Sequence, residues 1–252
     1  MRNMMIFQHV AHEPLGTLNP LLKKAGFKIR YLNFGRDGGL KPELEGYNGL
    51  IILGGPMGVY EADHYPHLRE EMRGIEQALK LGIPILGICL GSQLLAQVLG
   101  ATARKHERRE IGWYEVSLTQ EGQADPLFAG CRPREMIFQW HGDTFDVPRD
   151  ARHLAFTSGC ASQAFRYGEK VYGLQFHLEV DQPMIERWLQ VPGNQRELAE
   201  PGNAYSADQI RQDTERHIAR SLELSTEVFS RFMGLFGEFR RQAKLGSSGH
   251  GA

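Results

Sequence analysis

One short stretch, GICLGSQ at residues 87–93, places a cysteine between two glycines where the hydrophobic pattern of the chain changes. The residues before it, 83–88, are apolar and rich in isoleucine, which is typical of a buried parallel strand. The apolar residues of 90–99 recur at helical spacing, and a glycine follows as a helix-stop signal. The pattern therefore predicts a sharp strand-to-helix turn with Cys89 at its corner.

This turn is a favourable place for a reactive thiol. It lies at the carboxyl end of a strand and at the N-terminus of a helix, where the helix dipole favours the thiolate. An ordinary cysteine has a pKa of about 8.5, and such a position can lower that pKa by one or more units. The alternative is a buried structural cysteine, since free cysteines are among the most buried residues. The stretch by itself leaves both interpretations open.

The first half of the chain predicts an α/β fold. Strand-like runs at 4–7, 27–34 and 50–53 alternate with helical patterns at 18–24 and about 63–80. This alternation is typical of an open, mostly parallel sheet with helices on both faces. Ligands of such sheets bind at the carboxyl ends of the strands.

The second half adds strand patterns that we interpret as antiparallel additions to the sheet. They cover 113–119, 135–140, 153–158 and 163–180, the last a hairpin that turns at Gly168 and Glu169.

The chain after Val180 is predicted to be helical, with loop chemistry interrupting it at 191–203. Ser206 then begins a helix whose apolar stripe is expected to pack on the parent domain, with a subunit interface of a homo-oligomer as the alternative. We therefore expect three parts: a domain at 1–190, a helical extension packed on it at 191–244, and a disordered tail at 245–252.

Composition narrows the class of protein. The 252 residues include 29 basic and 30 acidic side chains, so the net charge of −1 argues against nucleic acid as a partner. The three cysteines have no C-x-x-C spacing, which argues against a disulfide framework or a zinc site and favours a reducing, cytoplasmic location. No apolar run approaches the roughly 20 residues of a membrane helix. The charged run RKHERRE at 104–110 is interpreted as a solvent-exposed face, and neither a metal nor a cofactor is expected.

A thiol nucleophile needs a base, and LQFHLEV at 174–180 offers one. His177 and Glu179 are two residues apart on a predicted strand, so both side chains point to the same face. Glu179 can then orient the imidazole, which pairs with Cys89 as in other catalytic triads. Taken alone, a histidine at a strand end is more often structural.

The same chemistry needs donors for an oxyanion. In an elbow, one donor is the amide of the residue after the nucleophile, here Leu90, and the other comes from a loop after a neighbouring strand. LGGPMG at 53–58 is such a loop, because its glycines let the backbone approach a ligand closely. A plain glycine turn is the alternative. The loop matches neither dinucleotide nor Walker phosphate motifs.

Four motifs in this order, GGPMG, GICLGSQ, WHGD and QFHLE, resemble the class I, triad-type glutamine amidotransferases, and among them the amidotransferase domain of GMP synthetase. The resemblance covers about residues 45–180. It implies a flavodoxin-like amidotransferase architecture. It also implies Cys89 as nucleophile, His177 as base, Glu179 as orienting acid, and the amides of Gly55 and Leu90 as the oxyanion hole.

The resemblance further implies a set of substrate-binding residues. Gln93 matches a residue that contacts the substrate glutamine, and Asp143 one that holds its α-amino group. His141 is expected to support them from behind. Leu178 stands where the family usually has proline, but its side chain faces away from the thiol.

The sequence contains no SGGxDS-like loop, the nucleotide-binding motif that the synthetase half of a GMP synthetase would bring. The chain is therefore expected to be a free-standing member. It would either deliver ammonia to a synthetase subunit in trans or hydrolyse γ-glutamyl compounds alone. The alternatives of other classes are a non-catalytic regulator that binds a ligand in the same pocket, and a cysteine hydrolase or isomerase of an unrelated reaction.

Overall fold

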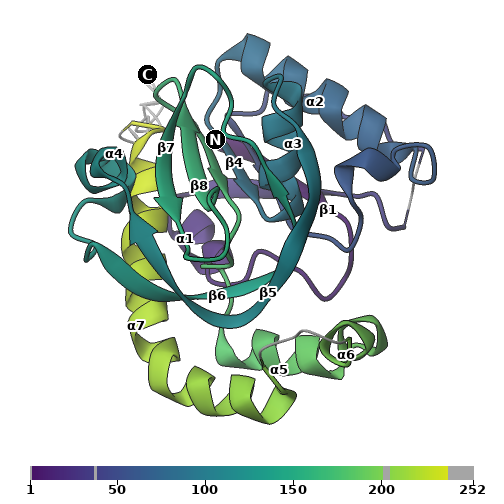
Figure 1. Ribbon diagram of the computed structural model, residues 1–252. Coiled ribbons are helices and arrows are strands. Elements are labelled where there is room, and N and C mark those ends of the chain that lie inside the picture. Colours follow the sequence, from purple (N-terminus) through teal and green to yellow (C-terminus); the bar gives the residue numbers. More distant parts are fainter. Residues whose placement is uncertain (1, 37–38, 201–204, 238–252) are drawn as a thin grey trace, which may run out of the picture.

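Nine strands form one mixed sheet in the computed structural model, which describes residues 2–36, 39–200 and 205–237 (Figure 1). Five neighbouring strands are parallel, in the order β2-β1-β3-β4-β9. Their bounds are β1 (Arg2–Gln8), β2 (Phe27–Asn33), β3 (Gly49–Ile52), β4 (Ile85–Ile88) and β9 (Val171–Leu174). This order is that of flavodoxin-like sheets, so the predicted α/β class is confirmed.

The other four strands extend the sheet from β9 in antiparallel fashion, in the order β8-β7-β5-β6. Their bounds are β5 (Ala103–Leu118), β6 (Arg134–Phe145), β7 (Ala151–Phe156) and β8 (Ala164–Tyr167). The predicted hairpin is confirmed, since β8 and β9 pair across a turn in which Gly168 has a φ of +58°. The β5–β6 ladder is irregular, because its register shifts between Lys105 and Glu110.

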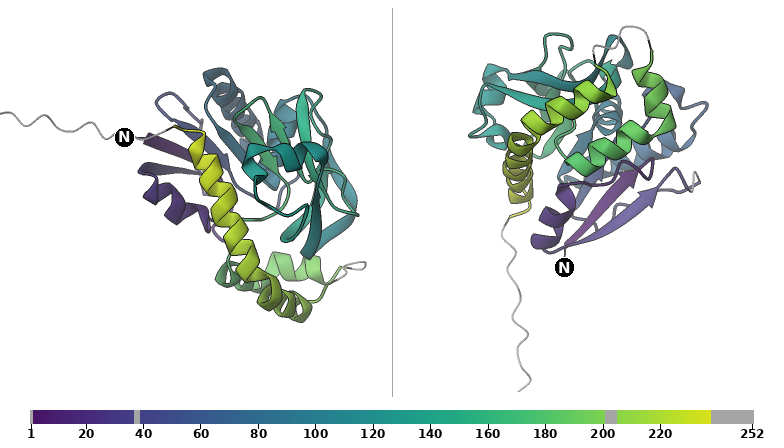
Figure 2. Two further views of the ribbon diagram at one scale, coloured as in Figure 1. Left: turned by 90° about the vertical axis from the view of Figure 1, so that its left-hand side faces the viewer. Right: turned by 90° about the horizontal axis from the view of Figure 1, so that it is seen from below.

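Helices cover both faces of the parallel strands (Figures 1 and 2). On one face lie α2 (His67–Leu81) and α3 (Leu90–Val98), and on the other lie α1 (Leu18–Lys24) and α7 (Ala207–Gly234). Alternate residues of β1 enter the two cores, as the two-residue period of a strand requires. The parallel strands are therefore apolar on both faces, which explains their continuous hydrophobic runs.

The remaining short elements are η1 (Val59–Glu61), α4 (Gln120–Ala124), η2 (Pro126–Phe128), α5 (Gln182–Gln190) and α6 (Pro192–Leu198). The prediction of a loop throughout 191–203 is wrong, because α6 begins within it. Pro192 occupies the first turn of α6, where its fixed φ suits a helix and its missing N–H costs nothing. Glu197 then ties the helix to the sheet by accepting a hydrogen bond from Trp140 Nε1 at 2.9 Å.

The long helix α7 begins as predicted, with the Ser206 hydroxyl accepting a hydrogen bond from the Gln209 amide at 3.2 Å. Its buried residues Leu224, Val228, Phe229 and Phe232 join the core that also contains α1. These contacts support the predicted packing of the extension on the parent domain. The division at residue 190 stays a prediction, and residues 238–244 and the predicted tail at 245–252 lie outside the described residues.

Within the described ranges, none of the helices is both long enough and apolar enough to cross a membrane.

Candidate active site

The turn between β4 and α3 has the strained geometry that the sequence predicts. Cys89 has φ 51° and ψ −112°, and among the described residues other than glycine it alone has a positive φ. A Cβ atom at Gly87 would lie 2.5 Å from the Gly91 carbonyl oxygen, and one at Gly91 would lie 2.2 Å from the Ile52 carbonyl oxygen. Only glycine therefore allows β3, β4 and α3 to approach this closely.

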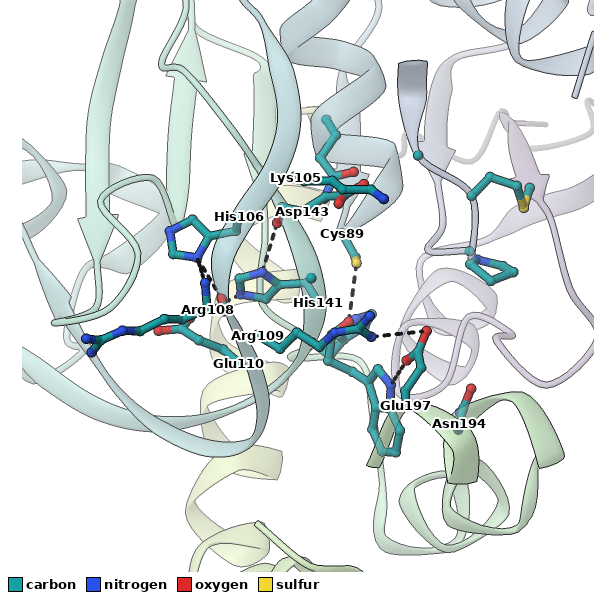
Figure 3. Close-up of a pocket in the computed structure, with 18 of the residues that line it drawn as sticks. Cys89, Lys105, His106, Arg108, Arg109, Glu110, His141, Asp143, Asn194 and Glu197 are labelled. Carbon is teal, nitrogen blue, oxygen red and sulfur yellow. Dashed lines mark hydrogen bonds and ion pairs between the residues drawn. The ribbon is translucent and has the colours of Figure 1, made fainter. Parts of the chain in front are cut away.

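Cys89 faces a cavity of about 850 Å³ at the carboxyl ends of the parallel strands (Figure 3). The cavity is walled by the loop after β3, by β5 and β6, and by α5 and α6. The predicted residues that line it are Gly55, Cys89, Gln93, His141, Asp143 and His177. The structure thus brings these six residues, drawn from distant parts of the chain, to one hollow.

His177 stands between a carboxylate and the thiol. Its Nδ1 donates a hydrogen bond to Glu179 Oε1 at 2.6 Å, which leaves Nε2 for Cys89 beside it. The Cys89 thiol lies 3.7 Å from the Trp140 carbonyl oxygen, to which it donates. The regular strand predicted for this segment is wrong, because β9 ends at Leu174. His177 is instead held by a single antiparallel bridge, in which its amide donates to the Phe138 carbonyl at 2.9 Å.

The charge state of the thiol differs from the prediction. Burial raises the pKa of Cys89 above its ordinary value, and this effect outweighs the opposing influence of His177. Burial disfavours the imidazolium of His177, but Glu179 and the thiolate form of Cys89 raise the pKa of this histidine well above its usual value, so the imidazolium is stabilised once the thiol has given up its proton. The expected low pKa of Cys89 is therefore wrong, because desolvation of the buried thiolate exceeds the stabilisation that the imidazole gives it.

The peptide between Gly54 and Gly55 is oriented by a buried histidine. His9 Nδ1 donates to the Gly54 carbonyl at 2.8 Å, and His9 Nε2 lies 2.7 Å from Glu71 Oε2. Both ring nitrogens are thus donors and His9 is an imidazolium: burial opposes its charge, but Glu71 raises its pKa. In a trans peptide the N–H points opposite to the carbonyl, so the Gly55 N–H points away from His9.

The predicted substrate-binding residues are partly engaged with one another. Gln93 Nε2 donates to Gln175 Oε1 at 3.1 Å, and Gln175 Nε2 in turn donates to the Cys89 sulfur at 3.6 Å. Asp143 accepts a hydrogen bond from the Tyr60 hydroxyl at 3.3 Å, and burial raises the pKa of its carboxyl. Asp143 is therefore a half-buried acid at the wall of the cavity.

His141 lies behind Asp143, as expected. Its Nδ1 donates to the Asp143 carbonyl at 2.9 Å and its Nε2 lies 3.1 Å from Glu110 Oε2. It therefore fixes the backbone that carries Asp143 (Figure 3).

Comparison with known proteins agrees with this arrangement. The sequence matches the family described as glutamine amidotransferase class-I over residues 21–185. This chain belongs to the class-I glutamine amidotransferase family. It is 33% identical over 197 residues to the glutamine amidotransferase-like protein YfeJ of Salmonella typhimurium, a match that covers 76% of this chain and 82% of that protein.

The solved structures of other family members have the same architecture. A glutamine amidotransferase from Thermotoga maritima superposes with a TM-score of 0.81 at 35% identity, covering 92% of this chain and 98% of that one. One from Methylobacillus flagellatus gives a TM-score of 0.85 at 27% identity, covering 96% of this chain and 98% of that one.

A GMP synthase of Borrelia garinii is similar in sequence over part of its length. It is 37% identical over 133 residues, which are 52% of this chain but only 24% of that enzyme.

The charged run 104–110 was predicted to be a solvent-exposed face, but in the structure part of it lines the cavity and part of it is buried. Lys105, Arg108 and Arg109 line the cavity from β5. Glu110 is only 2% exposed and accepts hydrogen bonds from Thr157 and Gln163 as well as pairing with His141. The interpretation as a solvent-exposed face is therefore wrong for Glu110, because the bulge in β5 turns this carboxylate inward.

Sequence reasoning also missed the loop from Gln8 to Thr17. This loop supplies His9 behind the Gly54 peptide and Glu13 inside the cavity, and its Thr17 amide donates to the Glu179 carbonyl at 2.9 Å. A signal was available, because the loop directly follows the carboxyl end of the first strand, where ligands of parallel sheets bind.

Gln175 was missed as well, although it shares the alternation of His177 and Glu179. The same two-residue spacing places it on their face.

Three buried side chains of the described residues could in principle ligate a metal. The ligand atoms of Glu110, His141 and Cys160 lie within 4.8 Å of one another. All three are already hydrogen-bonded, Cys160 to Thr144 Oγ1 at 3.2 Å. A metal would have to displace this network, and the absence of a metal or cofactor from the reaction stays a prediction.

Proposed function

We propose that this amidotransferase hydrolyses a γ-glutamyl amide through a γ-glutamyl thioester on Cys89. The observation that carries the proposal is the contact of the elbow thiol with His177, whose far nitrogen is held by Glu179 at 2.6 Å. This is the arrangement of a nucleophile, a base and an orienting acid.

In the first half-reaction, the Cys89 proton passes to His177 Nε2 as the sulfur attacks the γ-carbonyl carbon. The carbonyl oxygen becomes an oxyanion, for which the amides of Gly55 and Leu90 are the proposed donors. The orientation of the Gly54 carbonyl toward His9 supports this role for Gly55. His177 then gives its proton to the amine, the C–N bond breaks, and the thioester remains.

In the second half-reaction, water replaces the amine. His177 takes a proton from the water as its oxygen attacks the thioester carbon, and the C–S bond breaks with return of the proton to Cys89. The products are glutamate and a free amine, which is ammonia when glutamine is the substrate.

The γ-glutamyl part of the substrate is proposed to lie between Gln93 and Asp143. Asp143 would hold the α-amino group, because an ammonium requires an anionic partner. Gln93 would contact the γ-glutamyl chain, and His141 would keep Asp143 in place through its backbone carbonyl.

The size of the cavity favours γ-glutamyl compounds larger than glutamine. Its volume of about 850 Å³ is in the upper part of the range of roughly 300–1,000 Å³ for small-molecule sites. The alternative is a glutaminase that passes ammonia to a synthetase in trans. The similarity over 133 residues to a GMP synthase described as glutamine-hydrolysing supports this alternative.

The test is release of glutamate from glutamine and from a panel of γ-glutamyl peptides, with Cys89→Ala as the matched variant. We expect hydrolysis by the wild type and none by Cys89→Ala. Equal activity of the two proteins would contradict the proposal, and absence of activity with an inert Cys89 in the folded protein would favour a binding protein. If Asp143→Ala left KM unchanged, the proposed recognition of the α-amino group would be wrong.

A further inference from the structure

A second carboxylate, Glu13, faces His177 inside the cavity. A Cβ atom on Gly54 would lie 2.2 Å from Glu13 Oε2 and 3.2 Å from His177 Cε1, so these two atoms meet on one side of Gly54. Cε1 is the ring carbon between the two nitrogens of the imidazole. Glu13 therefore lies beside the same ring that Glu179 holds at Nδ1, near the carbon that joins Nδ1 to Nε2.

The loop that carries Glu13 is fixed rather than incidental to the site. The Glu13 amide donates to the Val10 carbonyl at 3.3 Å, and its own carbonyl accepts from Gln8 Nε2 at 3.3 Å. The next residue back, His12, accepts a hydrogen bond at its carbonyl from Trp188 Nε1 at 2.7 Å. The Trp188 ring also packs edge to face on His177, with 4.8 Å between ring centroids.

The Glu13 carboxylate has acceptor capacity to spare. Its side chain is 15% exposed, and His12 Nε2 lies 4.0 Å from Oε1, which is too long for a hydrogen bond. Burial lowers the pKa of His12, so this imidazole offers Glu13 little positive charge near neutral pH. Glu13 is thus a half-buried carboxylate at the cavity wall, and its oxygens are suited to accept a donor from a bound molecule.

The reaction supplies such a donor at this place. When His177 Nε2 gives its proton to the amide nitrogen, that nitrogen becomes positively charged and carries N–H bonds until the C–N bond breaks. We propose that Glu13 accepts a hydrogen bond from this leaving nitrogen and so favours expulsion of basic amines. This inference rests on the proposed function, since it concerns the amine that γ-glutamyl hydrolysis releases.

The charges around Glu13 fit this role. Burial raises the pKa of Glu13 to about 7, with Glu179 and Glu197 adding to the increase and His177 and His9 opposing it. Near pH 7 the Glu13 carboxyl is thus about half ionised, and above this pH most molecules carry the carboxylate that can accept from a cation.

The test compares two leaving groups in Glu13→Gln. γ-Glutamyl methylamide releases a basic amine, whereas γ-glutamyl p-nitroanilide releases an amine that carries almost no positive charge. Because a hydrogen bond to a charged group is strong, we expect kcat/KM for the methylamide to fall about 10- to 100-fold more than that for the p-nitroanilide. Glu121→Gln, an exposed carboxylate on α4, is the matched control and should change neither value.

The outcomes separate this inference from the proposed function. If the wild type hydrolyses neither compound, the proposed function fails. If the wild type hydrolyses both and Glu13→Gln lowers both values equally, or neither, Glu13 has no role in holding the amine while the proposed function stands.

A second measurement remains informative should Glu13→Gln fail to fold. In the wild type, the titrations of Cys89 and His177 change both kcat/KM values by the same factor, because both substrates need these two groups. These titrations therefore cancel in the ratio of the two values. The ratio of methylamide to p-nitroanilide should fall as pH decreases through about 7, because Glu13 then becomes neutral. The range from pH 5.5 to 8.5 extends about 1.5 units on either side of the Glu13 pKa of about 7, and a ratio that is constant over this range would overturn the inference.

Discussion

Replacing Cys89, the proposed nucleophile, with glycine should make the protein more stable than replacing it with alanine. Cys89 has φ 51° and ψ −112°, a conformation that costs a residue with a Cβ atom about 1–3 kcal/mol. Alanine keeps this strain and glycine removes it. At an ordinary position glycine is less stable than alanine by about 0.5–1 kcal/mol, because it loses more backbone entropy on folding.

With the middle of each range, the difference of these two effects predicts that Cys89→Gly is more stable than Cys89→Ala by about 1.2 kcal/mol, and by about 2.5 kcal/mol at most. Urea unfolding of the two variants at one pH measures this, and the melting temperatures should differ by about 2–4 °C per kcal/mol for a chain of this size. Both variants should be inactive, so the comparison does not depend on catalysis. If Cys89→Gly is the less stable variant, the backbone at the elbow is not strained and the geometry assigned to the nucleophile is wrong.

Three further predictions concern buried ionisable side chains, namely His9 and the cysteines. His9→Phe should lower kcat about 10²- to 10³-fold in steady-state assays, because the Gly54 carbonyl loses its donor and the oxyanion hole its alignment; an unchanged kcat would contradict this. Because the pKa of His9 is raised in the folded protein, its contribution to the free energy of unfolding is complete below about pH 6.5 and should be lost as pH rises through the pKa of the folded state. If the urea midpoint of the wild type does not fall with rising pH relative to that of His9→Phe, this prediction is wrong. Burial raises the pKa of all three cysteines, but His177 opposes this effect at Cys89, which also lines the cavity. Peptide mass spectrometry with iodoacetamide should therefore find Cys89 alkylated faster than Cys160 or than Cys131, whose pKa burial raises to about 11; faster reaction of either other thiol would contradict the assignment.

Local sequence patterns predicted the strand and the turn around Cys89 well. The run before Cys89, the helical spacing after it and the flanking glycines describe contacts between residues close in sequence, and such contacts leave a direct trace in the chain. The pairing of His177 with Glu179 was predicted for the same reason, although the strand assumed for it ends at Leu174.

The sequence predictions failed where contacts between residues far apart in the chain determine the local structure. The inward turn of Glu110 depends on a bulge opposite β6, and the helix α6 forms in a segment of loop-like composition that Trp140 holds through Glu197. The raised pKa of Cys89 follows from complete burial, a property of the whole fold. None of these has a periodic signature in the sequence.

Covalent labelling tests most directly whether Cys89 attacks a γ-glutamyl carbonyl. The purified protein is incubated with a diazo-ketone analogue of glutamine and the modified residue is identified by peptide mass mapping, with and without an excess of a γ-glutamyl substrate. We expect one label per chain, on Cys89, that the substrate prevents and that abolishes glutamate release. Labelling at another residue, or full hydrolytic activity in a protein whose Cys89 has been labelled, would contradict it.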